Sequence, residues 1–263
     1  MVSFYSRPSD PANSNPRIQS MTSFSVVIPT RGRQHFLKQA IMSVLAQHHA
    51  AHEIIVVDDG EGAAEAVGHM HHSIRVLDNQ RRGPVAARTL GVKAATGGCI
   101  AFLDDDDWWT DPHYLALAAA AFDQGATFTY ADGIMAFEDG RPPLPFALHA
   151  DADTLASDNS ILISAVIYRT SLHSPLGPFD ETLPYYWDWD WYLRVARGGQ
   201  LLVHITSPVV AIRVHARNMS GESLEAERRA NLDRFAAKHQ LPAIPLKNHL
   251  DIAMGSPGTP AVR

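Results

Sequence analysis

Four consecutive aspartates, at residues 104–107, are the strongest candidate for chemistry in this 263-residue sequence. They follow the apolar run 99–103 (CIAFL), which is typical of a buried strand, and two tryptophans come after them. Carboxylates this close together repel one another unless a cation neutralises them. Mg²⁺ or Mn²⁺ usually takes one or two protein carboxylates and completes its coordination with substrate phosphates and water. The cluster therefore predicts a divalent-metal site, the alternative being a solvated acidic turn before the next helix.

Two more polar clusters follow short apolar runs. FSVVI at 24–28 leads into PTRGR at 29–33, and EIIVV at 53–57 leads into DDG at 58–60. A carboxylate at the end of a strand can accept a hydrogen bond from a nucleotide base or a ribose hydroxyl. Guanidinium groups suit a diphosphate, and the candidates are Arg31, Arg33, Arg82 and Arg88. Asp-Gly is also ordinary turn chemistry, so a simple turn at 58–60 stays open.

A third acidic group lies among aromatic residues at 185–194 (YYWDWDWYLR). Burial beside such rings raises the pKa of a carboxyl group, and the rings can stack on sugars. Asp188 and Asp190 are therefore candidates for a general base. The alternative is a buried helix whose first-turn carboxylates stabilise its dipole. His215, between two arginines after the apolar run 208–212, is a further candidate ligand.

The spacing of apolar residues predicts the elements that would bring these groups together. We expect strands at 24–28, 53–57, 74–77, 99–103 and 160–169, and helices at 34–47, 84–95, 114–122 and 223–239. Strands rich in Val and Ile, joined by helices, are typical of a mostly parallel sheet with helices on both faces. Ligands bind at the carboxyl ends of such strands, so we expect the polar clusters to line one crevice.

Composition narrows the class of protein. Lys and Arg (22) against Asp and Glu (28) give a net charge of −6, without the basic field of a nucleic-acid binder. The single cysteine excludes a disulfide framework, and no apolar run approaches the roughly 20 residues of a membrane helix. Residues 1–23 and 246–263 are expected to be flexible tails, with Met1 and Met21 both open as the start. Without an apolar leader, a cytoplasmic location is expected.

Five segments of the chain, in order, resemble family 2 glycosyltransferases with the GT-A fold. They are SVVIPTRGR, EIIVVDDGE, GPVAARTLGVKAATGGCIAFLDDDDWW, GPFDETLPYYWDWDWYLR and RVHARNMS. The resemblance covers about residues 24–220 and implies an α/β GT-A domain at 24–245. Its nucleotide-sugar-binding half would span 24–110 and its acceptor and catalytic half 111–220. A helix within 221–245 would pack on the domain, with dimerisation or membrane contact as the alternatives.

The resemblance assigns roles to matching positions. Those around the donor are Pro29, Thr30, Arg31, Asp58, Asp59, Arg88, Asp104 and Asp105. Those at the metal are Asp106 and His215. Asp188 matches the general base, and the positions near the acceptor are Trp187, Asp190 and Trp191. The chain has Thr89 where Asn is usual, and Trp187 where Glu is usual, so Asp190 stays open as an alternative to Asp188.

The implied activity is inverting, metal-dependent transfer of a sugar from a nucleoside diphosphate sugar, most often UDP-linked, to a hydroxyl group. Mn²⁺ or Mg²⁺ would stabilise the leaving diphosphate, and one carboxylate would take the acceptor's proton. The acceptor would be a glycan, a lipid-linked sugar or a small molecule, in polysaccharide or glycoconjugate synthesis at the inner face of the membrane. Two alternatives are a metal-dependent phosphohydrolase and a non-catalytic GT-A domain that binds a sugar nucleotide or glycan.

Overall fold

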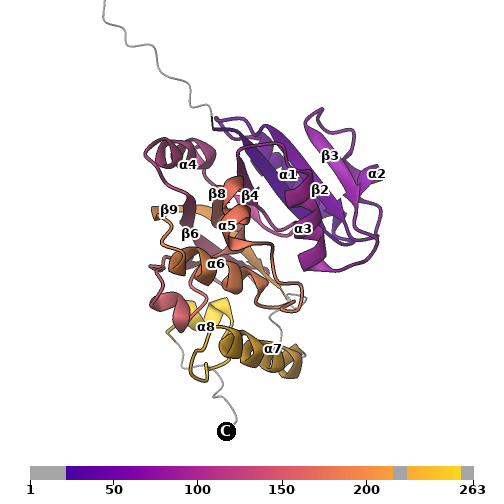
Figure 1. Cartoon of the computed structure of the whole chain (residues 1–263). Coiled ribbons are helices and arrows are strands. Elements are labelled where there is room, and N and C mark those ends of the chain that lie inside the picture. The colour runs from indigo at the N-terminus through magenta and orange to yellow at the C-terminus, as the bar shows by residue number, and fades with distance from the viewer. Residues whose placement is uncertain (1–21, 216–223, 256–263) are drawn as a thin grey trace, which may run out of the picture.

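One mixed sheet with helices around it makes up the chain (Figure 1), described by a computed structural model for residues 22–215 and 224–255. In these ranges nine strands pair in the order β3-β2-β1-β4-β8-β6-β9-β5, and β7 pairs with β6. The longest ladders, β1–β2, β2–β3 and β6–β9, are parallel. The expected α/β architecture with a mostly parallel sheet is confirmed.

The N-terminal half contributes four parallel strands. They are β1 (Phe24–Thr30), β2 (Glu53–Asp58), β3 (Ile74–Asp78) and β4 (Cys99–Phe102). Every residue of β1 and β2 is buried, as apolar runs without alternation predict for central parallel strands. The register sets Thr30 opposite Asp58, and Val27 opposite Phe102. The carboxyl ends of β1, β2 and β4 therefore lie side by side.

The C-terminal half mixes strand directions. β8 (Val166–Arg169) runs antiparallel to β4, and β6 (Phe128–Phe137) runs antiparallel to β8. The long strand β9 (Leu202–Val214) then runs parallel to β6, with register shifts around Asp132. The two short strands are β5 (Trp108–Trp109) and β7 (Leu144–Phe146).

Two features of this half differ from the sequence expectation. The strand expected at 160–169 begins only at Val166, because Ile163–Ala165 form a 3-10 turn in front of it. Strand β6 was not expected, since Asp132 and Gly133 interrupt its apolar pattern. Its pairing with β8 on one side and β9 on the other provides the stabilisation that the local sequence does not.

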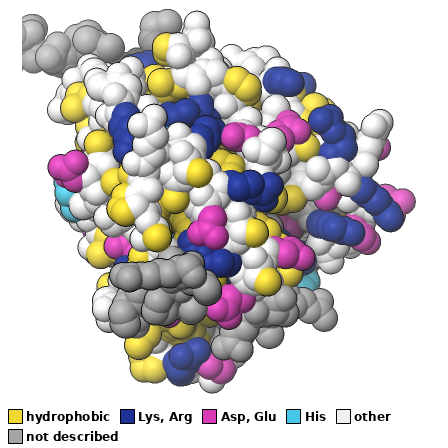
Figure 2. All heavy atoms as spheres, turned by 60° about the horizontal axis from the view of Figure 1, so that its bottom comes forward, with side chains coloured by type: hydrophobic (Ala, Val, Ile, Leu, Met, Phe, Trp, Pro, Cys, Tyr) yellow, Lys and Arg dark blue, Asp and Glu magenta, His cyan; other side chains and the backbone are white. Residues whose placement is uncertain are grey.

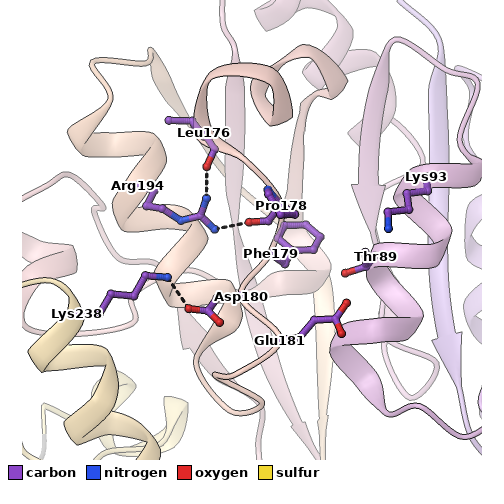
Figure 3. Close-up of a pocket in the computed structure, with 9 residues that line it drawn as sticks. All are labelled: Thr89, Lys93, Leu176, Pro178, Phe179, Asp180, Glu181, Arg194 and Lys238. Atoms are coloured by element: carbon purple, nitrogen blue, oxygen red, sulfur yellow. Dashed lines mark hydrogen bonds and ion pairs between the residues drawn. The ribbon is translucent and has the colours of Figure 1, made fainter.

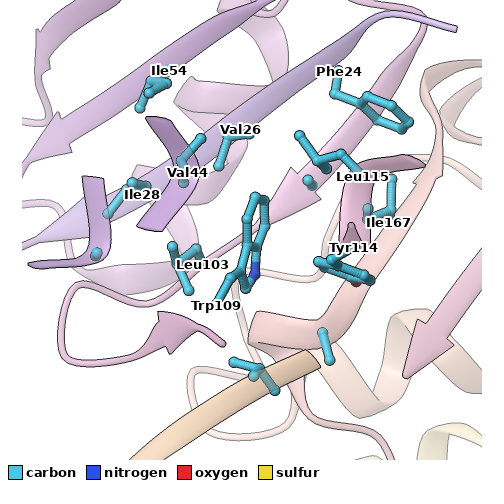
Figure 4. Packing of buried hydrophobic residues seen from close by; sticks show 14 of the residues in the cluster. Phe24, Val26, Ile28, Val44, Ile54, Leu103, Trp109, Tyr114, Leu115 and Ile167 are labelled. Atoms are coloured by element: carbon cyan, nitrogen blue, oxygen red, sulfur yellow. The ribbon is translucent and has the colours of Figure 1, made fainter. Parts of the chain in front are cut away.

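Alternate residues of β1 face two hydrophobic cores, since side chains alternate along a strand. Val26 and Ile28 belong to one core, part of which Figure 4 shows. Its helices are α1 (Gln34–Leu45), α2 (Ala63–Val67) and α4 (Tyr114–Asp123). Val27 belongs to the core on the opposite face. Its helices are α3 (Pro84–Ala94), α6 (Trp187–Arg197) and α7 (Glu225–Lys238).

Helix α3 packs unusually close to the sheet. Pro84 occupies its first turn, where the fixed φ of proline suits a helix start. At Gly91 an added Cβ would lie 2.4 Å from Cγ1 of Val27, so the position requires glycine. This close approach holds the buried side chain of Arg88, one turn earlier, against the sheet.

Residues 246–255 do not form the flexible tail expected for 246–263. Leu246 is buried, and α8 (His249–Ala253) follows with a capping box between Asn248 and Asp251. A five-residue helix is too short for apolar periodicity to reveal it. The rest of that tail, and residues 1–21 of the expected N-terminal tail, lie outside the described residues.

Short helices complete the secondary structure. They are α5 (His173–Leu176), η1 (Thr154–Ala156), η2 (Ile163–Ala165) and η3 (Thr170–Leu172). Within residues 22–215 and 224–255, no helix has the length and apolar character to cross a membrane.

Candidate active site

The ends of β1 and β4 meet in direct side-chain contact. The Thr30 hydroxyl donates a 2.7 Å hydrogen bond to Oδ2 of Asp105. Arg33, just beyond β1, forms an ion pair of 2.7 Å with Oδ1 of the same aspartate. Burial raises the pKa of Asp105 to about 6, although the Arg33 charge opposes the rise. The polar clusters at residues 29–33 and 104–107 thus form one site, in line with the expected crevice.

Asp106 is the meeting point of three segments far apart in the sequence. Its Oδ2 lies 3.0 Å from Nε2 of His215, which follows β9, and it also pairs with the Arg33 guanidinium. Carboxylate oxygens of Asp104, Asp106 and Asp107 lie within 4.8 Å of one another. Three carboxylates with one imidazole nitrogen suit Mn²⁺ or Mg²⁺, which prefer oxygen-rich ligand sets. The residues present therefore fit a divalent cation.

Asp107 is buried and carries an unexpected structural role. It accepts a 2.6 Å hydrogen bond from the Ser164 hydroxyl and a 3.0 Å bond from the backbone N–H of Arg213. Burial raises the pKa of Asp107 well above its usual range, and the charges of Asp106 and Asp104 add to the rise. Asp107 therefore joins the loop after β4 to η2 and β9.

Asp58 shapes the loop after β2 rather than facing solvent. Its carboxylate accepts hydrogen bonds of 3.0, 2.9 and 2.7 Å from the backbone N–H groups of Gly60, Glu61 and Ala63. Burial alone would raise the pKa of Asp58, but these bonds outweigh it and lower the pKa. The simple turn left open by the sequence is thus present here.

Asp59 joins the loop after β2 to the start of α3. Its Oδ1 accepts hydrogen bonds from Nδ2 of Asn79 (2.6 Å) and from the backbone N–H of Gly83 (3.2 Å). The buried Oδ1 of Asn79 has no hydrogen-bond partner among the described residues. The pair lies next to the end of β1, because the Asp59 N–H donates a 2.9 Å hydrogen bond to the Thr30 carbonyl.

The arginines near the site differ in their placement. Arg31 points away from the aspartates toward Glu61, at 3.8 Å, and its side chain is 62% exposed. Arg33 instead contacts Asp105 and Asp106, whereas the resemblance assigns Arg31, and not Arg33, to the donor. Pro29 is a buried member of β1 and provides backbone only.

Arg88 connects the aspartate cluster with the aromatic segment. One guanidinium nitrogen pairs with Oδ1 of Asp104, and another donates to the Pro84 carbonyl at 3.2 Å. The guanidinium carbon lies 5.0 Å from the ring centroid of Trp187, which is a cation–π distance. Trp187 therefore packs against the arginine that pairs with the aspartate cluster.

Asp188 lies in the first turn of α6 and is 8% exposed. Nδ2 of Asn159 donates a 3.1 Å hydrogen bond to its Oδ2. Burial raises the pKa of Asp188 to about 6, while the hydrogen bonds from the Trp189 backbone and from Asn159, and the charge of Arg88, oppose the rise. A carboxyl group with this pKa is ionised at neutral pH and still basic enough to take a proton.

Asp190 and Trp191 occupy positions unlike those expected near an acceptor. Asp190 is fully buried and pairs with Arg194, Lys238 and His239 at 2.7–2.8 Å, which ties α6 to α7. Trp191 is also fully buried and stacks on His173 with ring centroids 4.5 Å apart. Both side chains lie on the face of α6 that packs toward α7 and the core containing Val27, so neither is open to solvent.

A cavity of about 570 Å³ lies between α3 and the segment before α6 (Figure 3). Its lining comprises Thr89, Lys93, Leu176, Pro178, Phe179, Asp180, Glu181, Arg194 and Lys238. None of the residues expected at the donor, the metal or the base lines this cavity. Phe179 packs edge-on against Trp187, with centroids 4.9 Å apart, and so separates the cavity from Arg88 and Asp188.

Charged side chains of both signs are interspersed on the face that Figure 2 presents. Lys and Arg side chains lie beside Asp and Glu side chains, with apolar side chains between them. The visible side chains of this face therefore do not form a broad field of one sign.

Solved structures share the GT-A fold of this chain. S. aureus TarS 1–349 in complex with UDP-GlcNAc matches with a TM-score of 0.65 and 20% identity, covering 82% of this chain and 66% of that one. The mannosyltransferase PcManGT from Pyrobaculum calidifontis, in complex with GDP-Man and Mn²⁺, matches with a TM-score of 0.60 and 16% identity. That match covers 83% of this chain and 65% of PcManGT. At these identities the likeness shows the fold, and it confirms the expected fold class.

The sequence places the chain in a family. Residues 25–164 match the model of glycosyl transferase family 2. The uncharacterized glycosyltransferase YwdF of Bacillus subtilis (strain 168) is 34% identical over 235 residues, covering 85% of this chain and 87% of YwdF. A shorter match, 35% identical over 89 residues, is to the Escherichia coli UDP-Glc:alpha-D-GlcNAc-diphosphoundecaprenol beta-1,3-glucosyltransferase WfgD, covering 32% and 35% of the two chains. The chain belongs to glycosyl transferase family 2 and is a glycosyltransferase.

Proposed function

We propose that this glycosyltransferase moves a sugar from a nucleoside diphosphate sugar, with UDP as the favoured nucleotide, to an acceptor hydroxyl with inversion. The observation that carries the proposal is the buried carboxylate of Asp188, linked through Arg88 to the aspartate cluster at the carboxyl ends of the strands. A base and a cluster suited to a diphosphate thus lie on one side of the sheet.

The donor would bind across the ends of β1, β2 and β4. Thr30 and Asp59 are the groups we assign to the nucleotide, with Asp58 as the support that fixes their loop. Arg88 and Asp104 would face the donor beyond the nucleoside. Support for UDP comes from TarS, solved with UDP-GlcNAc, and from WfgD, named as a UDP-Glc enzyme.

Asp106 and His215 are the proposed metal ligands, with Asp104 and Asp107 beside them. When bound, a divalent cation there would offset the negative charge that develops on the leaving diphosphate. The oxygen-rich ligand set supports Mn²⁺ or Mg²⁺, and PcManGT was solved with Mn²⁺. Arg33 would hold Asp105 and Asp106 in place as the diphosphate approaches.

Asp188 would act as the general base. Ionised at neutral pH, it would take the proton of the acceptor hydroxyl as that oxygen attacks the anomeric carbon. Attack from the side opposite the leaving diphosphate inverts the anomeric configuration. Asp190 is unsuited to this step because its carboxylate is already bound by Arg194, Lys238 and His239. A sugar hydroxyl of a glycoconjugate is the acceptor we favour, since WfgD is named for a lipid-linked acceptor.

The base assignment is tested with Asp188→Asn. The variant keeps the size of the side chain and its hydrogen bond from Asn159 but loses the basic oxygen. We expect transfer to fall by about 10²–10⁴-fold, while the affinity for the donor nucleotide, measured by calorimetry, stays within a factor of about three of wild type. Retained turnover would contradict the assignment.

The donor and metal are tested with a thermal-shift panel of UDP, GDP, dTDP and CDP, each with and without Mn²⁺. Binding to the native state alone raises the melting temperature by mass action. We expect a Mn²⁺-dependent rise with UDP that is lost in Asp106→Ala. A response of the variant equal to that of wild type would contradict the metal site, and a response only to another nucleotide would change the donor class.

A further inference from the structure

We propose that Asn159 is a positioning residue for Asp188: its side-chain amide fixes the direction of the base carboxylate and stabilises its ionised form. The inference rests on the proposed role of Asp188 as the base. Asn159 carries no signal in the sequence, because it lies 29 residues before Asp188 in a loop between η1 and η2.

The contact between the two residues is direct and buried. Nδ2 of Asn159 lies 3.1 Å from Oδ2 of Asp188, and both residues are at most 9% exposed. Among the residues that the structure describes, Asn159 is the one side-chain hydrogen-bond donor to Asp188. An amide N–H to a carboxylate is a charge-assisted bond, which is stronger when the carboxylate is ionised.

The other end of the amide supports this interpretation. Oδ1 of Asn159 is buried and has no hydrogen-bond partner within residues 22–215 and 224–255. An unsatisfied buried oxygen is unfavourable for folding and calls for an explanation. A residue selected only for packing would be replaced by an apolar one without loss. The amide at this position is explained by its contact with Asp188.

The loop that carries Asn159 is anchored independently of this contact. Nε1 of Trp189 donates a 2.7 Å hydrogen bond to the Leu155 carbonyl, which joins α6 to the same loop. Nζ of Lys247 lies 2.8 Å from Oδ1 of Asp158. The side chains of Ile161 and Leu162 are buried. Substituting Asn159 therefore removes the amide without releasing the loop.

Other charged and titratable groups surround Asp188, and all of them remain in the Asn159 variants. Arg88 of α3 attracts its negative charge, and Arg88 also pairs with Asp104 of the aspartate cluster. Tyr192 of α6 and Tyr186 at the start of α6 face the same carboxylate, and Arg228 of α7 faces Tyr186. Because these groups are common to all variants, a change in the titration of Asp188 reports the amide itself.

The first measurement follows the carboxyl carbon of Asp188 by ¹³C NMR as pH is varied, with its signal identified by its loss in Asp188→Asn. In Asn159→Ala, loss of the donor is expected to raise the pKa of Asp188 by about one pH unit. In the isosteric Asn159→Asp, a second carboxylate replaces the donor, and the rise should be larger. An unchanged titration in both variants overturns the proposal.

The second measurement is the pH profile of UDP release from UDP-GlcNAc or UDP-glucose with Mn²⁺. The reaction needs ionised Asp188, so the acidic limb should move upward with the NMR titration, giving about fivefold slower turnover near pH 6 in Asn159→Ala. Asn231→Ala removes another fully buried asparagine, which contacts Tyr185, and should leave the limb in place. If the pKa of Asp188 rises in the NMR titration while the acidic limb of the pH profile stays in place, the positioning role is overturned.

The two proposals fail differently. If Asp188→Asn keeps full turnover, the base assignment fails, whatever the titration in the Asn159 variants. If Asp188→Asn is inactive and the Asn159 variants match wild type in both titration and profile, the positioning inference alone fails.

Discussion

At the scale of single residues, Asp188 and Asp190 show how environment decides the role of a carboxylate. A separation of two residues turns the side chains by about 200° around a helix, so the two face different surroundings. Asp188 receives one amide and is desolvated, which raises its pKa to about 6. Asp190 is also buried, but His239, Lys238 and Arg194 more than compensate and lower its pKa. One carboxylate is suited to accept protons, the other to hold two helices together.

The raised pKa of Asp188 predicts a gain in stability for Asp188→Asn at neutral pH. Since the folded-state pKa of about 6 lies above the ordinary 3.8, burial favours the protonated form. The contribution of Asp188 to the free energy of unfolding is therefore most favourable below pH 4. It falls by about 3 kcal/mol in total as pH rises through 6. Asparagine does not ionise, so the variant should avoid this loss.

Urea unfolding of both proteins between pH 4 and pH 8 measures the effect. We expect equal free energies of unfolding, within about 1 kcal/mol, near pH 4 and a more stable variant above pH 6. A stability difference that does not depend on pH would show that Asp188 is not held in a desolvated site.

At the scale of elements, helix α3 connects the aspartate cluster with the start of α6. It carries Arg88, which pairs with Asp104 and lies over Trp187. The position of the helix depends on Gly91, where it lies closest to Val27 of β1. Gly91 thus sets how closely α3 can bring Arg88 to Asp104.

Gly91→Ala is expected to lower stability by about 1–3 kcal/mol, because the added methyl would lie 2.4 Å from the Val27 side chain and push α3 off the sheet. The shift should also lower turnover by moving Arg88. Gly98→Ala is the control, since its Cβ would meet its nearest neighbour, Oγ of Ser23, at 3.7 Å. Equal melting temperatures for the two variants would contradict the close packing of α3.

At the scale of the whole molecule, the site is assembled from both ends of the described chain. His215, at the end of β9, reaches Asp106 across 109 positions of sequence. The C-terminal segment reaches the loop of Asn159 through Lys247 and Asp158. The segment after α7 therefore contacts the loop whose Asn159 binds Asp188.

Truncation after residue 245 tests this role. It removes the buried side chain of Leu246, whose burial contributes about 1.5–3 kcal/mol, together with the Lys247–Asp158 ion pair and α8. We expect a clearly lower melting temperature and reduced turnover. Truncation after residue 255 keeps every contact described and is the control. Equal behaviour of the two truncations would mean that residues 246–255 are dispensable, as the sequence had suggested.

Much of this protein followed from its sequence alone. Runs of Val and Ile predict buried parallel strands because such strands are apolar on both faces. The polar clusters after those runs predict one site because the carboxyl ends of parallel strands share an edge. On this basis the fold class and the meeting of Thr30 with the aspartate cluster were accessible without coordinates, and the family followed from the resemblance of five segments.

Only the tertiary structure decided which of several chemically equivalent side chains face the site. Arg33 rather than Arg31 reaches the aspartates, Asp190 is held in ion pairs by α6 and α7, and Asn159 joins Asp188 from a distant loop. These choices depend on partners many residues away and on the face that a helix turns toward its neighbours. A local pattern of residue types contains neither, so the strands and their polar ends were predictable while the partners of each carboxylate were not.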